Sequence, residues 1–165
     1  MNKLKFMAIS LPYGLKFIDV FDSIEDLKSF DVTNMWANGN PYFKINKIKP
    51  ILFPLSSLTK EIEHNGEKFV PIVELAKIIV DLPDRFPYCF ETKVSSILQS
   101  EKHEFGYNHR GQSFHLFDRE SMEFKPFPNQ LELFQNLIEW HFDIAGLIEK
   151  GEAIDVNTLE TNPYK

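Results

Sequence analysis

The feature that most constrains the fold is a double apolar stripe near the C-terminal end of the sequence. Apolar residues recur four and three positions apart, at Leu133, Leu137, Trp140, Ile144 and Leu147. A second stripe lies beside the first, at Phe134, Ile138, Phe142, Ala145 and Ile148. So wide an apolar face predicts a long helix over about 130–150, buried at the centre of the core. Asn129 is placed to cap its start and Gly151 to end it.

Shorter patterns predict small elements along the first half of the chain. Alternating apolar residues predict two strands within residues 1–18, with a turn marked by Pro12 and Gly14. Capping residues or helical spacing predict three short helices, over 22–28, 55–62 and 72–80. Between the last two, Asn65–Gly66 is a strong turn signal that leads into a short extended piece.

Residues 86–127 are the most aromatic and strand-like part of the sequence. Two alternating segments flank Asn108–Gly111, which has the length and residues of a hairpin loop, and Met122–Phe127 predicts a third strand. The chain has 16 phenylalanines against five alanines, so we expect an aromatic core. We therefore predict a single compact α+β domain over 1–165, in which a small antiparallel sheet packs on a few helices, including the long buried C-terminal helix.

The net charge of −6 is unevenly distributed along the chain. Residues 1–60 carry eight lysines against five acidic residues, whereas residues 61–165 carry ten basic residues against nineteen acidic ones. This balance excludes a uniformly basic nucleic-acid-binding protein, because binding phosphates needs a positive field. The acidic second part suits a basic surface on a partner protein, and ordinary solubilising charge is the alternative explanation.

The sequence also indicates a cellular compartment. Its single cysteine, Cys89, excludes an internal disulfide, and its apolar neighbours should raise the pKa of the thiol. The N-terminal residues are too interrupted by charge for a signal peptide, and no apolar run approaches the roughly 20 residues of a membrane span. We expect a cytoplasmic protein that binds no membrane.

Histidines supply the candidates for metal binding or catalysis. On a hairpin, His103 and His115 could lie opposite each other with His109 at the tip, but a tip residue does not converge with such a pair on a zinc ion. We therefore expect no metal, and no sequence motif indicates a cofactor. An enzyme that uses these histidines, or His141 as a general base, remains an alternative.

Another alternative is single-stranded nucleic acid. Aromatic rings that stack on bases, interleaved with lysines that contact phosphates, are typical of such sites. The candidate residues are Trp36, Tyr42, Lys44, Lys47 and Lys49.

Three segments are similar to one group of proteins. Leu133–Leu159 resembles the C-terminal segment of small bacteriophage and prophage proteins whose activities are not established. Ile48–Pro71 and Leu11–Phe17 resemble segments of the same group, at matching relative positions. The resemblance implies a phage context and no catalytic residues.

In that context we expect a non-enzymatic binding protein that acts in the cytoplasm of the host bacterium. Its partner would be a host defence protein such as a CRISPR effector nuclease, inhibited by protein–protein contact in the manner of an anti-CRISPR protein. The candidate partner-binding residues are acidic: Glu139, Asp143, Glu149, Glu152, Asp155 and Glu160.

Overall fold

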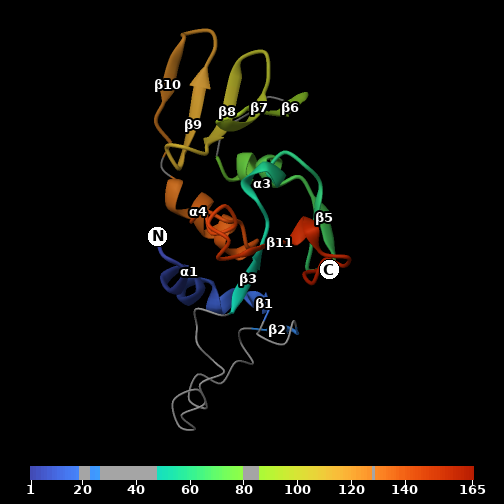
Figure 1. Cartoon of the computed structure of the whole chain (residues 1–165). Helices are drawn as coiled ribbons and strands as arrows, with labels where there is room; N and C mark the ends of the chain where they lie inside the picture. Colours follow the sequence, from blue (N-terminus) through green and yellow to red (C-terminus); the bar gives the residue numbers. More distant parts are fainter. Residues whose placement is uncertain (19–22, 27–47, 80–85, 128) are drawn as a thin grey trace. The chain divides into compact units, whose positions relative to one another are not determined.

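The structure is a computed structural model that describes residues 1–18, 23–26, 48–79, 86–127 and 129–165 (Figure 1). Over these residues the fold is mixed α+β, as predicted, and largely antiparallel sheets dominate it. The chain divides into two compact units: a terminal unit of residues 1–54 and 138–165, and a middle unit of residues 55–137. The expectation of one domain over 1–165 therefore stays a prediction. None of the helices in the described ranges is both long and apolar enough to span a membrane.

The terminal unit is built on a four-stranded sheet in the order β11-β3-β1-β2. Its elements are α1 (Lys3–Ser10), a 3-10 turn (Leu11–Tyr13), β1 (Lys16–Ile18), β2 (Ile24–Asp26), β3 (Lys49–Leu52), β11 (Ile154–Asp155) and a second 3-10 turn (Val156–Thr158). Strand β11 runs parallel to β3, and the other pairs are antiparallel. Side chains of α1, β1, β3 and the 145–153 segment form its core, including Phe6, Phe17, Leu52 and Leu147.

Two predictions for the N-terminal residues are wrong. The first predicted strand is the helix α1, which begins where the Asn2 side chain accepts a hydrogen bond from the Lys5 N–H at 3.0 Å. The helix predicted over 22–28 contains β2, because Ile24 pairs with Ile18 across the sheet. The second predicted strand is confirmed as β1, and Gly14 at the preceding turn has a φ of 72°.

The long C-terminal helix is also wrong: α4 runs only from Gln130 to Glu139. Beyond it, His141 has a φ of 59°, and the backbone of 141–143 pairs with Phe53 through two hydrogen bonds of 2.9 Å. The Asp143 carboxylate accepts hydrogen bonds from the N–H groups of Leu147 and Ile148, at 2.8 and 2.7 Å. An Asp side chain that binds nearby backbone N–H groups competes with helix formation, so Phe142, Ala145 and Leu147 of the stripe are buried without being helical.

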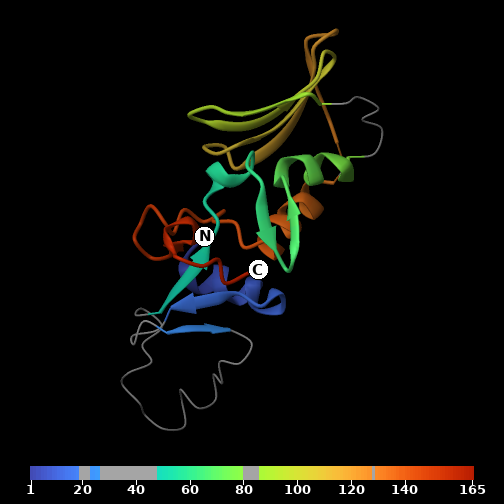
Figure 2. The same cartoon turned by 90° about the vertical axis from the view of Figure 1, so that its right-hand side faces the viewer.

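The middle unit contains a five-stranded antiparallel sheet in the order β10-β9-β8-β7-β6. Its elements are a 3-10 turn (Leu55–Ser57), β4 (Ile62–His64), β5 (Glu67–Phe69), α3 (Pro71–Ile78), β6 (Tyr88–Glu91), β7 (Ser95–Gln99), β8 (His103–Asn108), β9 (Ser113–Asp118), β10 (Glu123–Lys125) and the first eight residues of α4. Figure 2 shows the five strands as one layer, with α3 on one side of it.

Most predictions for this unit are confirmed. The Asn65–Gly66 turn joins β4 and β5, with φ values of 52° and 81°, and the helix after it is α3. The strand-rich part of the sequence forms the five-stranded sheet. The helix predicted over 55–62 is wrong, since only a 3-10 turn forms there and Ile62 pairs with Phe69 in the hairpin. Cross-strand pairing therefore overrides the helical spacing at this position.

One face of the five-stranded sheet forms the core of the middle unit. Five side chains on this inner face are buried: Leu98, Phe105, Tyr107, Phe114 and Leu116. Phe134 of α4 packs with its ring centroid 5.3 Å from that of Phe114 and 6.1 Å from that of Tyr107. The Gln130 side chain donates a hydrogen bond to the Phe114 carbonyl at 3.1 Å, which fixes the start of the helix against the sheet.

Candidate functional site

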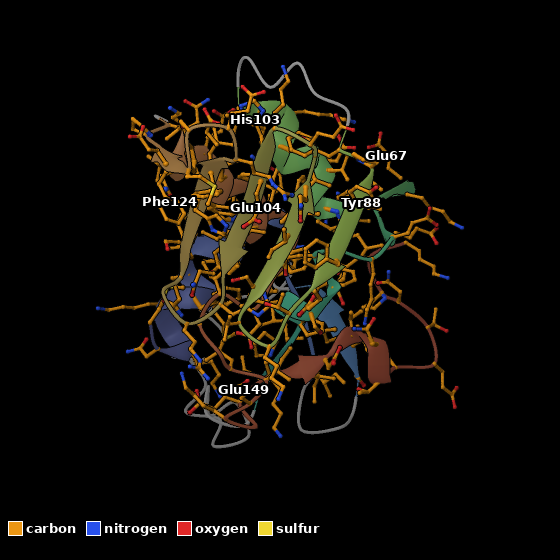
Figure 3. The ribbon with its side chains drawn as sticks, turned by 90° about the horizontal axis from the view of Figure 1, so that it is seen from above. Glu67, Tyr88, His103, Glu104, Phe124 and Glu149 are labelled. Atoms are coloured by element: carbon orange, nitrogen blue, oxygen red, sulfur yellow. The ribbon has the colours of Figure 1, made fainter. Side chains whose placement is uncertain are left out.

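Strand pairing in the five-stranded sheet places a second set of side chains on the opposite, outer face. One row across the strands pairs Tyr88 with Gln99, Gln99 with Glu104, Glu104 with Phe117 and Phe117 with Phe124. A second row joins Phe90, Ile97, Gly106 and His115. Successive residues of a strand point to opposite faces, so these nine residues share one face. Figure 3 looks onto it, with Tyr88 and Phe124 towards opposite edges and Glu104 between them.

The outer face exposes large aromatic side chains. Tyr88 is 60% exposed, Phe90 39% and Phe124 70%, and Met122 in the adjoining turn is 72% exposed. Single exposed apolar residues are ordinary, but several on one sheet face form a patch of the kind that marks a binding surface. Phe134 of α4 packs on the opposite, inner face, against Tyr107 and Phe114.

Near the centre of the outer face, a histidine lies across a glycine and contacts a carboxylate. The Nε2 atom of His115 is 3.3 Å from Oε1 of Glu104 on the neighbouring strand. A Cβ atom on Gly106 would be only 2.6 Å from Cε1 of His115 and 3.0 Å from the Ser96 carbonyl oxygen. The absence of a side chain at Gly106 therefore lets the imidazole lie directly on β8, within reach of Glu104.

Two phenylalanines complete this arrangement, which we name the Glu104 cluster: Glu104, His115, Phe117 and Phe124. The ring centroid of Phe124 is 5.1 Å from that of Phe117 and 6.0 Å from that of His115, both in edge-to-face geometry. Glu104 and His115 are partly exposed, with 27% and 21% of their side chains accessible. The cluster thus presents a carboxylate beside three rings on an open surface.

Charges are sparse on the outer face. The nine residues that define it include one carboxylate, Glu104, and no lysine or arginine. The Lys125 ammonium lies on the other side of β10, where it contacts Asp118 at 3.4 Å and Glu123 at 3.6 Å. The outer face therefore lacks the cations that a phosphate backbone requires.

A second polar group, Ser96, His109 and Glu91, lies on the inner face. Ser96 Oγ is 2.8 Å from His109 Nε2, and His109 Nδ1 is 4.0 Å from Glu91 Oε1. These are the residue types of a nucleophile, a base and an orienting acid. Ser96 is completely buried, however, so the arrangement links β6, β7 and the end of β8 instead of presenting a nucleophile to a substrate.

Burial dominates the titration of the groups around Ser96. It lowers the pKa of His109, an effect that the nearby Glu91 carboxylate partly opposes. It also raises the pKa of Tyr107 to about 12. The pKa of the Cys89 thiol on β6 is raised by burial and by Glu91, as its apolar neighbours predicted. His109 and Cys89 are therefore both favoured in their neutral forms.

The remaining histidine predictions concern the pair His103 and His115, metal binding, and His141. His103 and His115 do not lie opposite each other: His103 pairs with Asp118, and His115 pairs with Gly106. The described ranges contain no group of three or more His, Cys, Asp or Glu side chains that could hold a metal ion. His141, the candidate general base, is 1% exposed and its ring centroid is 4.4 Å from that of Tyr164. It is therefore a buried residue of the terminal unit.

The six acidic candidates all lie in the terminal unit, in two different states. Four are exposed: Glu139, Glu149, Glu152 and Glu160. Asp143 is 4% exposed and binds the backbone, so it does not belong to an accessible acidic surface. Asp155 is half-buried and accepts a hydrogen bond from the Asn157 N–H at 2.8 Å, which caps a 3-10 turn. These two carboxylates are occupied within the fold.

The nucleic-acid alternative rests largely on residues outside the described ranges. Trp36, Tyr42, Lys44 and Lys47 lie there, so the proposed interleaving of rings and lysines stays a prediction. Lys49 is described, and it is exposed on β3.

Comparison with known proteins adds no relative: no family model, no curated protein and no solved structure matches the chain.

Proposed function

We propose that this chain is a non-enzymatic binding protein that contacts another protein through the outer face of β6–β10. The observation that carries the proposal is the gathering of Tyr88, Phe90 and Phe124 on one open sheet face, each more than a third exposed. Aromatic side chains are enriched in the energetically important centres of protein–protein interfaces. A face without lysine or arginine favours a protein over a nucleic acid as its partner.

The resemblance to phage proteins supports a narrower form of the proposal. In that setting the partner is a host defence protein such as a CRISPR effector nuclease, which the chain inhibits by occupying part of its surface. The net charge of −6 would speed association with the basic surface of a nucleic-acid enzyme. The exposed Glu139, Glu149, Glu152 and Glu160 contribute to that field.

The experiment compares aspartate substitutions at exposed apolar positions inside and outside the outer face. Phe124→Asp and Tyr88→Asp place a charge on it, whereas Leu131→Asp places the same charge at an exposed position of α4, where Leu131 is 72% exposed. We expect the first two variants to lose at least about tenfold in inhibition, the usual effect of disrupting an interface centre. Leu131→Asp should keep the wild-type value.

Inhibition is measured as plaque formation on a host with an active CRISPR system, and as target cleavage by the purified effector. Thermal unfolding of each variant shows whether it is folded. Wild-type protein that neither protects phage nor binds a purified defence protein would overturn the inhibitor proposal. Equal inhibition by all three folded variants would overturn the assignment of the outer face.

A further inference from the structure

We infer that the Glu104 cluster binds the guanidinium group of an arginine side chain on the partner protein. This inference rests on the proposed function, and it specifies the chemistry that the outer face recognises. A guanidinium group is planar, stacks on aromatic rings and donates paired hydrogen bonds to a carboxylate. The Glu104 cluster supplies both kinds of contact within one small area.

The first argument concerns the carboxylate. Its Oε1 atom is 3.3 Å from His115 Nε2, and within the described ranges its other oxygen, Oε2, has no polar partner. A protein that covers the outer face would remove Glu104 from water. Burial of an ionised carboxylate is costly unless an opposite charge accompanies it. The nine residues that define the outer face include no lysine or arginine, so apart from His115, when it is protonated, a cation that pairs with Glu104 comes from the partner.

The second argument concerns the rings. Pairing places Glu104 directly opposite Phe117, and Phe117 directly opposite Phe124, so carboxylate and rings follow one row across three strands. Neighbouring strands lie about 4.8 Å apart, so an arginine that extends along this row can place its aliphatic part on the rings and its guanidinium at Glu104. Phe124 is 70% exposed, so much of its ring remains accessible to a cation beside the edge-to-face contact with His115.

Charge complementarity also selects against a second copy of this chain. Two outer faces packed together would bring two Glu104 carboxylates into one apolar interface, without a lysine or arginine from either face. Among the residues of the two faces, only the His115 side chains, when protonated, could offset these two buried charges. We therefore assign the surface to a different protein that carries an arginine.

The test is an NMR titration of the isotope-labelled full chain with Nα-acetyl-arginine amide. The matched ligand is Nα-acetyl-citrulline amide, which has nearly the same planar shape without the charge. Nα-acetyl-lysine amide provides a cation without the planar group that donates paired hydrogen bonds. We expect saturable shifts at Glu104, His115, Phe117 and Phe124 with the arginine ligand, and weaker binding of the other two.

Two variants locate the site. Glu104→Gln removes the charge with little change of shape and should weaken arginine binding about three- to fivefold, as expected for one partly exposed ion pair. Glu101→Gln makes the same change at an exposed residue of the β7–β8 turn and should have no effect. Equal binding of arginine and citrulline, equal binding of arginine and lysine, or unchanged binding by folded Glu104→Gln would each overturn the inference. So would the absence of shifts with arginine.

The outcome separates this inference from the proposed function. Loss of inhibition by Phe124→Asp together with no arginine binding would leave the outer face as a docking surface and remove the guanidinium site. Arginine binding at Glu104 with undiminished inhibition by Phe124→Asp would keep the guanidinium site and remove the outer face as the surface that docks the inhibited partner. A concentration-dependent dimer that dissociates on Phe124→Asp would identify a second copy as the occupant and overturn the assignment to a foreign arginine.

Discussion

Substitution of Gly106 by alanine tests the geometry on which the Glu104 cluster depends. A Cβ at this position would lie 2.6 Å from Cε1 and 2.8 Å from Nε2 of His115, and 3.0 Å from the backbone oxygen of Ser96. The imidazole is the end of a side chain and can move, whereas the Ser96 carbonyl belongs to the neighbouring strand. We therefore expect the ring to leave β8 and the His115–Glu104 contact of 3.3 Å to break.

The cost follows from the two close contacts. Overpacking of a well-packed site typically destabilises a protein by about 1–3 kcal/mol, and we expect Gly106→Ala to fall in that range. His115→Ala removes the atoms at 2.6 and 2.8 Å and leaves the contact of 3.0 Å with Ser96. In the His115→Ala background, Gly106→Ala should therefore cost at least about 1 kcal/mol less than in the wild type.

The assay is a double-mutant cycle of urea unfolding on the four proteins. A matched glycine control is Gly111→Ala in the β8–β9 turn, where the nearest atoms to a Cβ are side-chain oxygens at 3.3 Å. This substitution should be milder and independent of His115. If Gly106→Ala costs the same with and without the imidazole, His115 does not lie on Gly106, and the geometry of the cluster is refuted.

Four further substitutions test other parts of the structure. Asp143→Ala should destabilise the protein by about 2–4 kcal/mol in urea unfolding, because the buried Leu147 N–H and the partly buried Ile148 N–H lose their acceptor. A hydrogen bond from the Ser121 N–H is the main reason that the pKa of Asp118 is lowered to about 2. The ionised Asp118 carboxylate therefore stabilises the fold above about pH 4, and this stabilisation is lost as the pH falls towards 2. In Asp118→Asn, the free energy of unfolding should depend less on pH over this range. Burial lowers the pKa of His109, so stability should fall as pH drops below about 6.5, and less so in His109→Gln. Alkylation of Cys89 by iodoacetamide should require a higher pH than alkylation of a free thiol, and Glu91→Gln should reduce the difference.

Local turn chemistry was the most reliable guide to the fold. Asn65–Gly66 joins β4 and β5 because both residues adopt positive φ, which these residue types tolerate best. The β8–β9 hairpin was also predictable, but its register was not. The centre of its turn lies between Arg110 and Gly111 and not at His109, so His103 pairs with Asp118 instead of His115.

That change of register moves His115 to the other face of the sheet. The side-chain period in a strand is two residues, so an odd shift in pairing exchanges the inner and outer faces. His103 belongs to the same face as Phe105 and Tyr107, whereas His115 lies opposite Gly106 beside Glu104. The Glu104 cluster could not be predicted because it exists only once the pairing of three strands is known.

The end of α4 was unpredictable for a different reason. The stripe from Leu133 to Ile148 satisfies the helical period, and no local signal distinguishes its second half. Backbone pairing with Phe53, a residue distant in sequence, ends the helix, and Asp143 completes the alternative hydrogen bonds. The same contacts remove Asp143 from the acidic surface, since a net charge cannot show which carboxylates the backbone occupies.

The role of the outer face in binding is tested most directly by comparing how strongly Phe124→Asp and Leu131→Asp inhibit the partner, expressed as a ratio. Phe124 is 70% exposed and Leu131 is 72% exposed. Both substitutions add the same charge at apolar positions of nearly equal fractional exposure, so the effect of the added charge cancels in the ratio. With the outer face as the docking surface, we expect at least about a tenfold loss for Phe124→Asp and none for Leu131→Asp. Equal inhibition by the two folded variants would contradict a role for the outer face in binding.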